Sequence, residues 1–337
     1  MENIASNRLG LRRLLNLASM TPLGFLGLVL LGLFPILPYL NQGYLIRWFI
    51  WAAIVAAASM AFDFSGGYIS IVNFGFSAFI GVGAYSSALI ALRLGISPWL
   101  SMFLGILPAA LLGFLVGAVS LRLRGMFAIC FTWFVGLAFF GLAMKLVPLT
   151  RGPLGLRAPY LFKTSSNLPY FYVAFGMLVV TYIVLKWILR SHLGLAFQAI
   201  GQNVEAAMTS GIYPAWYRII NFTVSCGFAG WLGGFYAHYY GILTPDLMHT
   251  SKTVEILVIA YVGGRKSLWG GVLVAFPFVY AMEMIRSSLA NLPGLNLIIY
   301  GLFLILIMIY YPGGLAESYQ VYLGQSRNPL VRWLINK

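Results

Sequence analysis

The chain has 337 residues, of which 61% are hydrophobic and only 8% are charged. A soluble globule of this length needs far more polar surface, so the composition excludes that class and indicates a polytopic membrane protein. The formal charge of +14 does not indicate nucleic-acid binding, because the basic residues gather mostly at the ends of apolar runs, as the positive-inside rule and anionic lipids require.

The sequence predicts an all-α fold of about ten transmembrane helices with broken or re-entrant segments. A basic amphipathic stretch occupies residues 1–21, and no convincing cleavage pattern follows it, so a retained first span is expected. Apolar runs close to the ~20 residues that cross ~30 Å of hydrocarbon then recur along the chain. They cover approximately residues 22–40, 44–62, 76–93, 98–119, 125–144, 168–189, 217–241, 268–290 and 296–311.

The first irregular segment, DFSGGYISIVNFG, runs from residue 63 to residue 75 and interrupts two apolar runs. Irregular backbone at membrane depth is costly unless it is buried in protein or lines a cavity. Broken helices of this kind often line transport paths. A plain connection between two helices is the alternative. The residues that we assign to a translocation path are Ser65, Gly66, Gly67, Asn73, Ser77 and, from a later segment, Glu255.

A polar, helix-forming insert occupies residues 193–218 and is expected to dock a partner. Its apolar residues recur every three or four positions, which places them on one face of one helix or of two short helices. Asn203 is expected to be the N-cap of the second helix, with Glu205 in the first turn and Gly211 in a left-handed conformation after the end. An ordinary interfacial helix is the alternative. The apolar residues are Leu193, Phe197, Ile200, Val204 and Met208.

The segment from Thr253 to Gly264 is too short for a regular span and is interpreted as a broken or tilted tenth crossing. Within it Glu255 has no local charged neighbour in TVEILVIAYVGG, so an interhelical or helix-terminus contact is expected. Glu283 is expected to pair with Arg286 one turn along its helix. A glycine-rich turn follows the short crossing and contains Gly263, Gly264, Ser267 and Gly270.

The basic residues predict the orientation in the membrane. Arg122, Arg190, Arg265 and Lys266 share one side only if the short segment crosses, which puts residues 193–218 and both termini in the cytoplasm. The basic segment 145–163 then falls outside, which weakens the assignment without reversing it. The expected division is a cytoplasmic N-terminus, a membrane domain over residues 22–315 that contains the 193–218 loop, and a cytoplasmic tail over 316–337.

Chemistry-bearing motifs are sparse. The two cysteines have neither disulfide nor metal spacing, and no nucleophile–base pattern surrounds the three histidines. No phosphate-binding Gly-x-x-x-x-Gly-Lys-Ser/Thr string is present, and GGRKS is only superficially similar to one. We therefore expect no catalytic residue, no metal and no cofactor on this chain. Any ATP hydrolysis must come from a partner.

Together these strings resemble the longer of the two permease subunits of bacterial ABC importers of the branched-chain amino acid type. The likeness covers residues 62–315 and includes Glu-Ala-Ala-x-x-x-Gly in the loop by which such permeases contact their ATPases. Singly the strings are weak, but their order and spacing are fairly specific. They are NFGFSAFIGVGAY (73–85), LRLRGMFAI (121–129), the loop at 191–218, AGWLGGFYAHYYGILTPD (229–246), VEILVIAYVGGRKSLWGGVL (254–273) and YPGGL (311–315).

The resemblance implies a multi-pass protein of the bacterial inner membrane that acts with partners. These are a second, homologous permease, two cytoplasmic subunits that bind ATP and Mg²⁺, and a periplasmic protein that delivers leucine, isoleucine or valine. The 193–218 loop would be the ATPase coupling loop. The residues that the resemblance assigns to it are Asn203, Glu205, Ala206, Ala207, Gly211 and Ile212.

Departures from the family pattern leave the substrate and the ATPase contact open. Lys266 stands where the glycine turn of the family has its third glycine, and Phe76 replaces a residue that is frequently polar. Leu195, Gln198 and Gly201 stand where relatives are often basic. A permease for urea or short amides is one alternative. An ion-coupled secondary transporter that uses buried acids such as Glu255 is another.

Overall fold

The computed structural model describes residues 43–121, 123, 125–164 and 166–288, and residues 298, 299, 301, 302, 305 and 309 near the C-terminus. The predicted N-terminal stretch 1–21, the predicted span 22–40, the YPGGL string and the tail 316–337 lie outside the described residues, as does most of the predicted span 296–311. The expected domain limits at 22 and 315 therefore also lie outside them.

The described part of the chain is almost entirely helical. Its only strands are β1 (Leu156–Arg157) and β2 (Ile242–Leu243), which pair antiparallel with Leu156 opposite Leu243. Two short helical turns, η2 (Gly152–Leu154) and η3 (Pro245–Met248), lie close to these strands in the sequence. The α-helices are α3 (Gly43–Gly66), α4 (Phe76–Leu94), α5 (Pro98–Leu104), α6 (Ile106–Ser120), α7 (Met126–Lys145), α8 (Val147–Thr150), α9 (Leu168–Arg190), α10 (His192–Gln202), α11 (Val204–Thr209), α12 (Pro214–Tyr240), α13 (Thr250–Gly263) and α14 (Leu268–Ser288).

The all-α, polytopic prediction is confirmed, but the count of about ten helices is not. Among the described residues, 6 helical segments are long and apolar enough to cross a membrane, namely α3, α4, α5 with α6, α7, α9 and α14. The predicted span 98–119 is divided at Gly105, where α5 ends and α6 begins. α12 has 27 residues but is not in this set, because glycines and polar side chains such as Asn221 lower its hydropathy. α13 has only 14 residues, as expected for a broken crossing.

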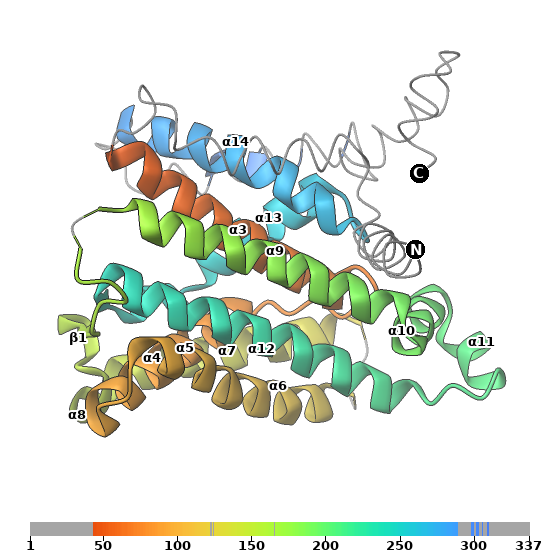
Figure 1. The fold of residues 1–337 in the computed structure, drawn as a ribbon. Helices are drawn as coiled ribbons and strands as arrows, with labels where there is room; N and C mark the ends of the chain where they lie inside the picture. Colours follow the sequence, from red (N-terminus) through yellow and green to blue (C-terminus); the bar gives the residue numbers. More distant parts are fainter. Residues whose placement is uncertain are drawn as a thin grey trace, which may run out of the picture.

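α12 lies between two groups of helices, with α3, α9 and α14 on one side and α4 and α6 on the other (Figure 1). Glycines allow the closest approach. A Cβ atom on Gly83 of α4 would overlap the backbone of Gly230 in α12, and a Cβ atom on Gly233 would overlap the carbonyl oxygen of Ile80. Small residues supply much of the packing energy between helices in lipid, because they let backbones touch.

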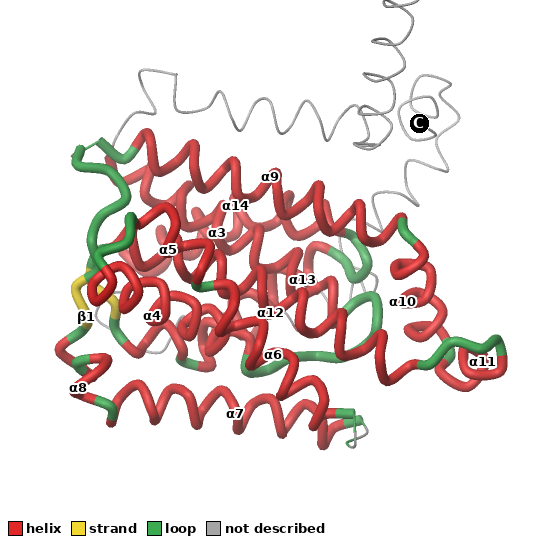
Figure 2. The backbone as a smooth tube through the Cα atoms, turned by 60° about the horizontal axis from the view of Figure 1, so that its bottom comes forward, coloured by secondary structure: helices red, strands yellow, loops and turns green. Residues whose placement is uncertain are grey.

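The two ends of the bundle differ. α10 and α11 project from one end, and β1, α8 and the 151–167 segment lie at the opposite end (Figures 1 and 2). We call these the α10–α11 end and the β1–β2 end. The basic segment 145–163 therefore lies across the bundle from the predicted docking loop, as the orientation predicted from the sequence requires.

Candidate functional site

The predicted docking loop folds as two short helices, α10 and α11. The residues at the ends of α11 have the positions that the sequence predicted. The Asn203 side-chain Oδ1 accepts hydrogen bonds from the backbone N–H groups of Glu205 (2.9 Å) and Ala206 (3.1 Å). Asn203 is therefore the N-cap of α11. Glu205 lies in the first turn, where a carboxylate suits the positive end of the helix dipole.

The C-terminus of α11 closes through a Schellman motif at Gly211. The N–H of Ile212 donates to the carbonyl oxygen of Ala207, and the N–H of Gly211 donates to that of Met208, both at 3.0 Å. Gly211 has φ 82°, and open space lies where a Cβ atom would project. The requirement for glycine here is conformational, because left-handed φ values strain other residues.

The apolar face predicted for the loop is partly wrong. Phe197 and Ile200 are buried, but Leu193 and Met208 are exposed, with 37% and 52% of their surface accessible. The 3.6-residue period fails because the chain bends at the extended Asn203, so that α11 buries Ala207 instead. The exposed apolar side chains of the loop are Leu193, Leu195, Met208, Tyr213 and Trp216.

The loop packs directly on the irregular segment that follows α3. A Cβ atom on Gly201 of α10 would overlap the carbonyl oxygen of Tyr68, so the two backbones touch. Phe197 meets Phe64 edge-on, with ring centroids 5.6 Å apart. A displacement of α10 is therefore transmitted to the residues after α3 without an intervening flexible side chain.

The irregular segment is shorter than the predicted 63–75, because α3 continues to Gly66; residues 67–75 are non-helical and held by side chains. Thr132 Oγ1 accepts from the N–H of Phe74 at 3.1 Å, and Asn73 Oδ1 accepts from the N–H of Gly75 at 3.0 Å. A Cβ atom on Gly75 would overlap the carbonyl oxygen of Thr132 in α7. The end of the segment, Asn73 to Gly75, is thus packed in protein and hydrogen-bonded, which is the condition for non-helical chain at membrane depth, whereas Ser70 is exposed.

The glycine turn between α13 and α14 contacts the end of α3. The Lys266 N–H donates to Asp63 Oδ1 at 3.2 Å, Tyr68 Oη donates to the Lys266 carbonyl oxygen at 2.7 Å, and Arg265 Nη2 donates to the Gly66 carbonyl oxygen at 3.3 Å. Lys266 has φ 64° and Gly264 has φ 107°. The irregular segment after α3 and the glycine turn therefore form one structure. Of the residues in these contacts, the sequence analysis assigned only Gly66 to a site.

The other predicted path residues make contacts between helices. Ser77 Oγ donates to the Met248 carbonyl oxygen at 3.1 Å, and the Ser77 N–H donates to Thr253 Oγ1 at 3.0 Å. Ser65 Oγ donates to the Phe62 carbonyl oxygen and lies 3.4 Å from Ser225 Oγ of α12. These contacts join α3, α4, α12 and α13 around the irregular segment. A role of these residues in a translocation path remains a prediction.

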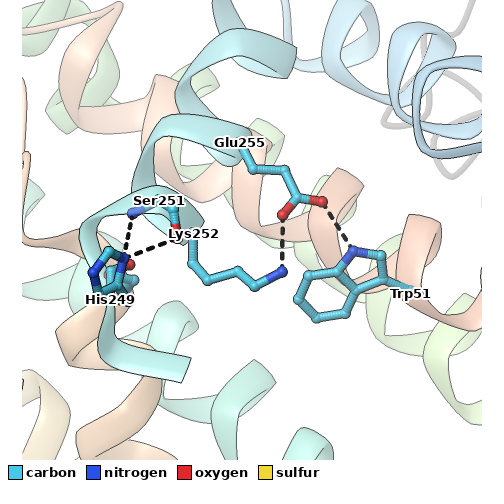
Figure 3. Close-up of polar contacts among 6 residues, drawn as sticks. Trp51, His249, Ser251, Lys252 and Glu255 are labelled. Carbon is cyan, nitrogen blue, oxygen red and sulfur yellow. Dashed lines mark hydrogen bonds and ion pairs between the residues drawn. The ribbon is translucent and has the colours of Figure 1, made fainter. Parts of the chain in front are cut away.

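The prediction that Glu255 lacks a local partner is wrong. Lys252, one turn earlier on α13, places Nζ 3.1 Å from Glu255 Oε2, and Trp51 of α3 donates from Nε1 to Oε1 at 3.0 Å (Figure 3). Lys252 Nζ also lies 4.7 Å from the centroid of the Trp51 ring. The string considered in the sequence began after Lys252, which is why this partner was missed. The expected interhelical contact is present, since Trp51 belongs to α3. The Arg286 side chain expected to pair with Glu283 lies outside the described side chains.

A cavity of about 490 Å³ opens at the β1–β2 end. Two cationic side chains, Arg47 and Lys163, and four tyrosines contribute to its lining; the tyrosines are Tyr160, Tyr170, Tyr239 and Tyr240. No acidic side chain of the described residues lines it. No sequence pattern indicates this cavity, because its residues come from α3, α9, α12 and the loop before α9.

Residues 44–308 match the family model described as "Branched-chain amino acid transport system / permease component". The chain belongs to this family. It is thereby a multi-pass membrane component of a transport system, and not an enzyme, as the sequence analysis expected. Family membership does not identify the residues of this permease component that contact a substrate or a partner.

Curated relatives of the chain are also permease proteins of transport systems. The chain is 28% identical over 277 residues to the "High-affinity branched-chain amino acid transport system permease protein LivM" of Escherichia coli, and 27% identical over 277 residues to its Salmonella typhimurium counterpart, covering 74% of this chain in each case. It is 26% identical over 209 residues, 54% of this chain, to the "Nucleoside ABC transporter permease protein NupC" of Lactococcus lactis. The chain spans 64% of the length of each relative. No solved structure matches.

Proposed function

We propose that this permease component is the membrane subunit of an ATP-driven importer for small amino acids of the branched-chain class. The observation that carries the proposal is the α10–α11 loop, which is capped at both ends, exposes Met208, Tyr213 and Trp216, and packs through Gly201 on the irregular segment. Exposed aromatic and methionine side chains are typical of protein docking surfaces. The loop is thus suited to receive a partner on one face and move the membrane domain with the other.

The partners of the proposed importer are a second, homologous permease, two ATPases that carry ATP and Mg²⁺, and a binding protein that delivers the substrate outside. The coupling residues are Asn203, Glu205, Ala206, Ala207, Gly211 and Ile212. In this arrangement the α10–α11 end and both termini face the cytoplasm of a bacterial inner membrane. Residues 22–315 are its membrane domain, and the segments around Gly67, Asn73, Glu255 and Gly264 line or control the path.

The substrate has one further candidate, a nucleoside, because the similar Lactococcus lactis protein is described as a nucleoside permease. Reconstitution of this chain in proteoliposomes with its gene-neighbour permease, ATPases and binding protein tests both substrates. We expect ATP-dependent accumulation of leucine, isoleucine or valine, insensitive to a proton uncoupler while ATP is maintained. Accumulation of adenosine instead would show that the substrate is a nucleoside. Uptake by this chain alone, abolished by the uncoupler, would contradict ATP-driven import.

A further inference from the structure

The Lys252–Glu255 pair lies well inside the bundle. Trp51, which touches both side chains, is about 12 Å along α3 from its first residue and about 22 Å from its last. An ionised side chain at such a depth costs about 2.5 to 3.5 kcal/mol or more when unpaired, so charges there normally serve a function. The pair therefore needs an explanation beyond helix packing.

The pair is open on one side. The Glu255 side chain is 8% exposed, but that of Lys252 is 35% exposed. An ammonium group has three N–H donors, and the described residues provide one hydrogen-bond acceptor for Lys252, which is Glu255 Oε2. Hydrocarbon cannot accept the others, so water, a partner, a ligand or a part of the chain outside the described residues must meet this face of α13.

A row of aromatic rings connects the Lys252–Glu255 pair with the cavity at the β1–β2 end. Tyr240, which lines the cavity, lies 4.4 Å from Tyr236, and Tyr236 lies 5.9 Å from Trp51, measured between ring centroids. On α3, Arg47 of the cavity precedes Trp51 by one helical turn. The cationic cavity and the Lys252–Glu255 pair are thus consecutive positions along the same faces of α3 and α12.

We propose that Lys252, Glu255 and Trp51 form a recognition site for a zwitterionic α-amino acid, reached from the β1–β2 end through the cavity lined by Arg47 and Lys163. The cavity attracts the α-carboxylate. At the deeper site Lys252 binds that carboxylate, Glu255 binds the α-ammonium, and the rings of Trp51 and Tyr236 contact the aliphatic side chain. This inference rests on the proposed import function and assigns the residues that recognise its substrate.

The chemistry of the pair selects this class. An α-amino acid carries an ammonium group and a carboxylate on one carbon, so it can bind two neighbouring opposite charges and leave no charge unpaired. A neutral nucleoside offers hydrogen bonds but no opposite charge to either group, and an anion or a cation alone pairs with one of them. Discrimination is strong when a missing ligand group leaves a buried partner unpaired.

The test measures equilibrium binding of tritiated leucine to the assembled, nucleotide-free complex without binding protein. Two competitors each lack one charge: 4-methylpentanoate lacks the ammonium group, and leucinamide lacks the carboxylate. For the wild type we expect leucine to compete at least about tenfold better than either analogue, the factor expected from one charged hydrogen bond. Glu255→Gln should abolish the preference over 4-methylpentanoate, and Lys252→Gln should abolish the preference over leucinamide.

Controls separate recognition from a structural pair. The double variant K252Q/E255Q leaves no unpaired charge, so it should fold and lose both preferences. Glu283→Gln, on neighbouring α14, removes an acid outside the proposed site and should keep both. Variants that weaken leucine and both analogues equally would show a structural pair only and overturn the inference. A wild-type complex that transports leucine but shows no saturable binding would also overturn it. Failure of the wild-type complex to transport any amino acid would instead contradict the proposed function.

Discussion

At the scale of single residues, Lys266 shows how one departure from the family pattern is accommodated. Its φ of 64° is the left-handed conformation, which explains why a glycine suits this place in the turn. The backbone strain of about 1 kcal/mol at a non-glycine residue is offset by the hydrogen bonds of its N–H and carbonyl groups to Asp63 and Tyr68.

This predicts a graded series at position 266. Lys266→Gly should leave the thermal stability of the detergent-solubilised protein unchanged or raised, because the left-handed strain is removed. Lys266→Val should lower the free energy of unfolding by about 1 kcal/mol or more, since a β-branched residue is more strained there. Tryptophan fluorescence during heating provides the measurement. Equal stability of the glycine and valine variants would contradict the proposed strain.

The residues that the sequence predicted correctly are those with local signals. Asn203, Glu205 and Gly211 have roles set by neighbours within a few positions, so their types and spacing define them. Trp51, Tyr68 and Arg47 were missed because their contacts join segments about 110 to 200 positions apart, which no spacing rule reports. The pairing of Lys252 with Glu255 could have been predicted from the sequence, since Lys252 lies one turn before Glu255.

At the scale of elements, the predicted spans that fall on described residues match helices to within a few residues, because apolar runs in lipid have a required length. The break at Gly105 was not predicted, since the apolar run passes through it unchanged. The apolar face of the docking loop was misassigned because a regular period was continued through the non-helical Asn203.

The structure of α11 predicts that substitutions in it impair coupling to the ATPases without preventing the permease from folding. Gly211→Val should leave the permease inserted but lower the substrate-stimulated ATP hydrolysis of the assembled complex by roughly fivefold, as expected for about 1 kcal/mol of strain in the docked conformation. Gly211→Asn is the matched control, because asparagine tolerates the left-handed conformation and no neighbour lies within 4 Å of the added Cβ atom. Glu205→Lys should act like the valine variant. Unaltered hydrolysis in these two variants would contradict a coupling role and indicate that the loop is an ordinary interfacial helix.

The contact of α10 with the irregular segment predicts a second, different defect. Gly201→Leu places a side chain where the Tyr68 carbonyl oxygen lies, which separates α10 from residues 67–75. We expect the assembled complex to keep at least half of its ATP hydrolysis and to transport several-fold less substrate per ATP. Gln202→Leu, at the exposed neighbouring position, is the control. Proportional loss of hydrolysis and transport would show damage to the ATPase contact instead.

At the scale of the whole molecule, the orientation is testable with one cysteine. Gln202 is exposed at the α10–α11 end, and Tyr160 is exposed at the opposite end. With native cysteines replaced, Gln202→Cys should react with a membrane-impermeant maleimide only after the cells are opened, and Tyr160→Cys should react in intact cells. The reverse pattern would invert the proposed topology.

The irregular segment after α3 also constrains how the protein is made. The N–H of Phe74 is hydrogen-bonded by Thr132, and the N–H of Ser77 by Thr253, both of which are synthesised later than α4. An unpaired amide in hydrocarbon costs several kcal/mol. α3 and α4 therefore cannot settle in their final positions until α7 and α13 have entered the membrane. The helices of the described bundle that are synthesised first are therefore among the last to reach their final positions during biogenesis.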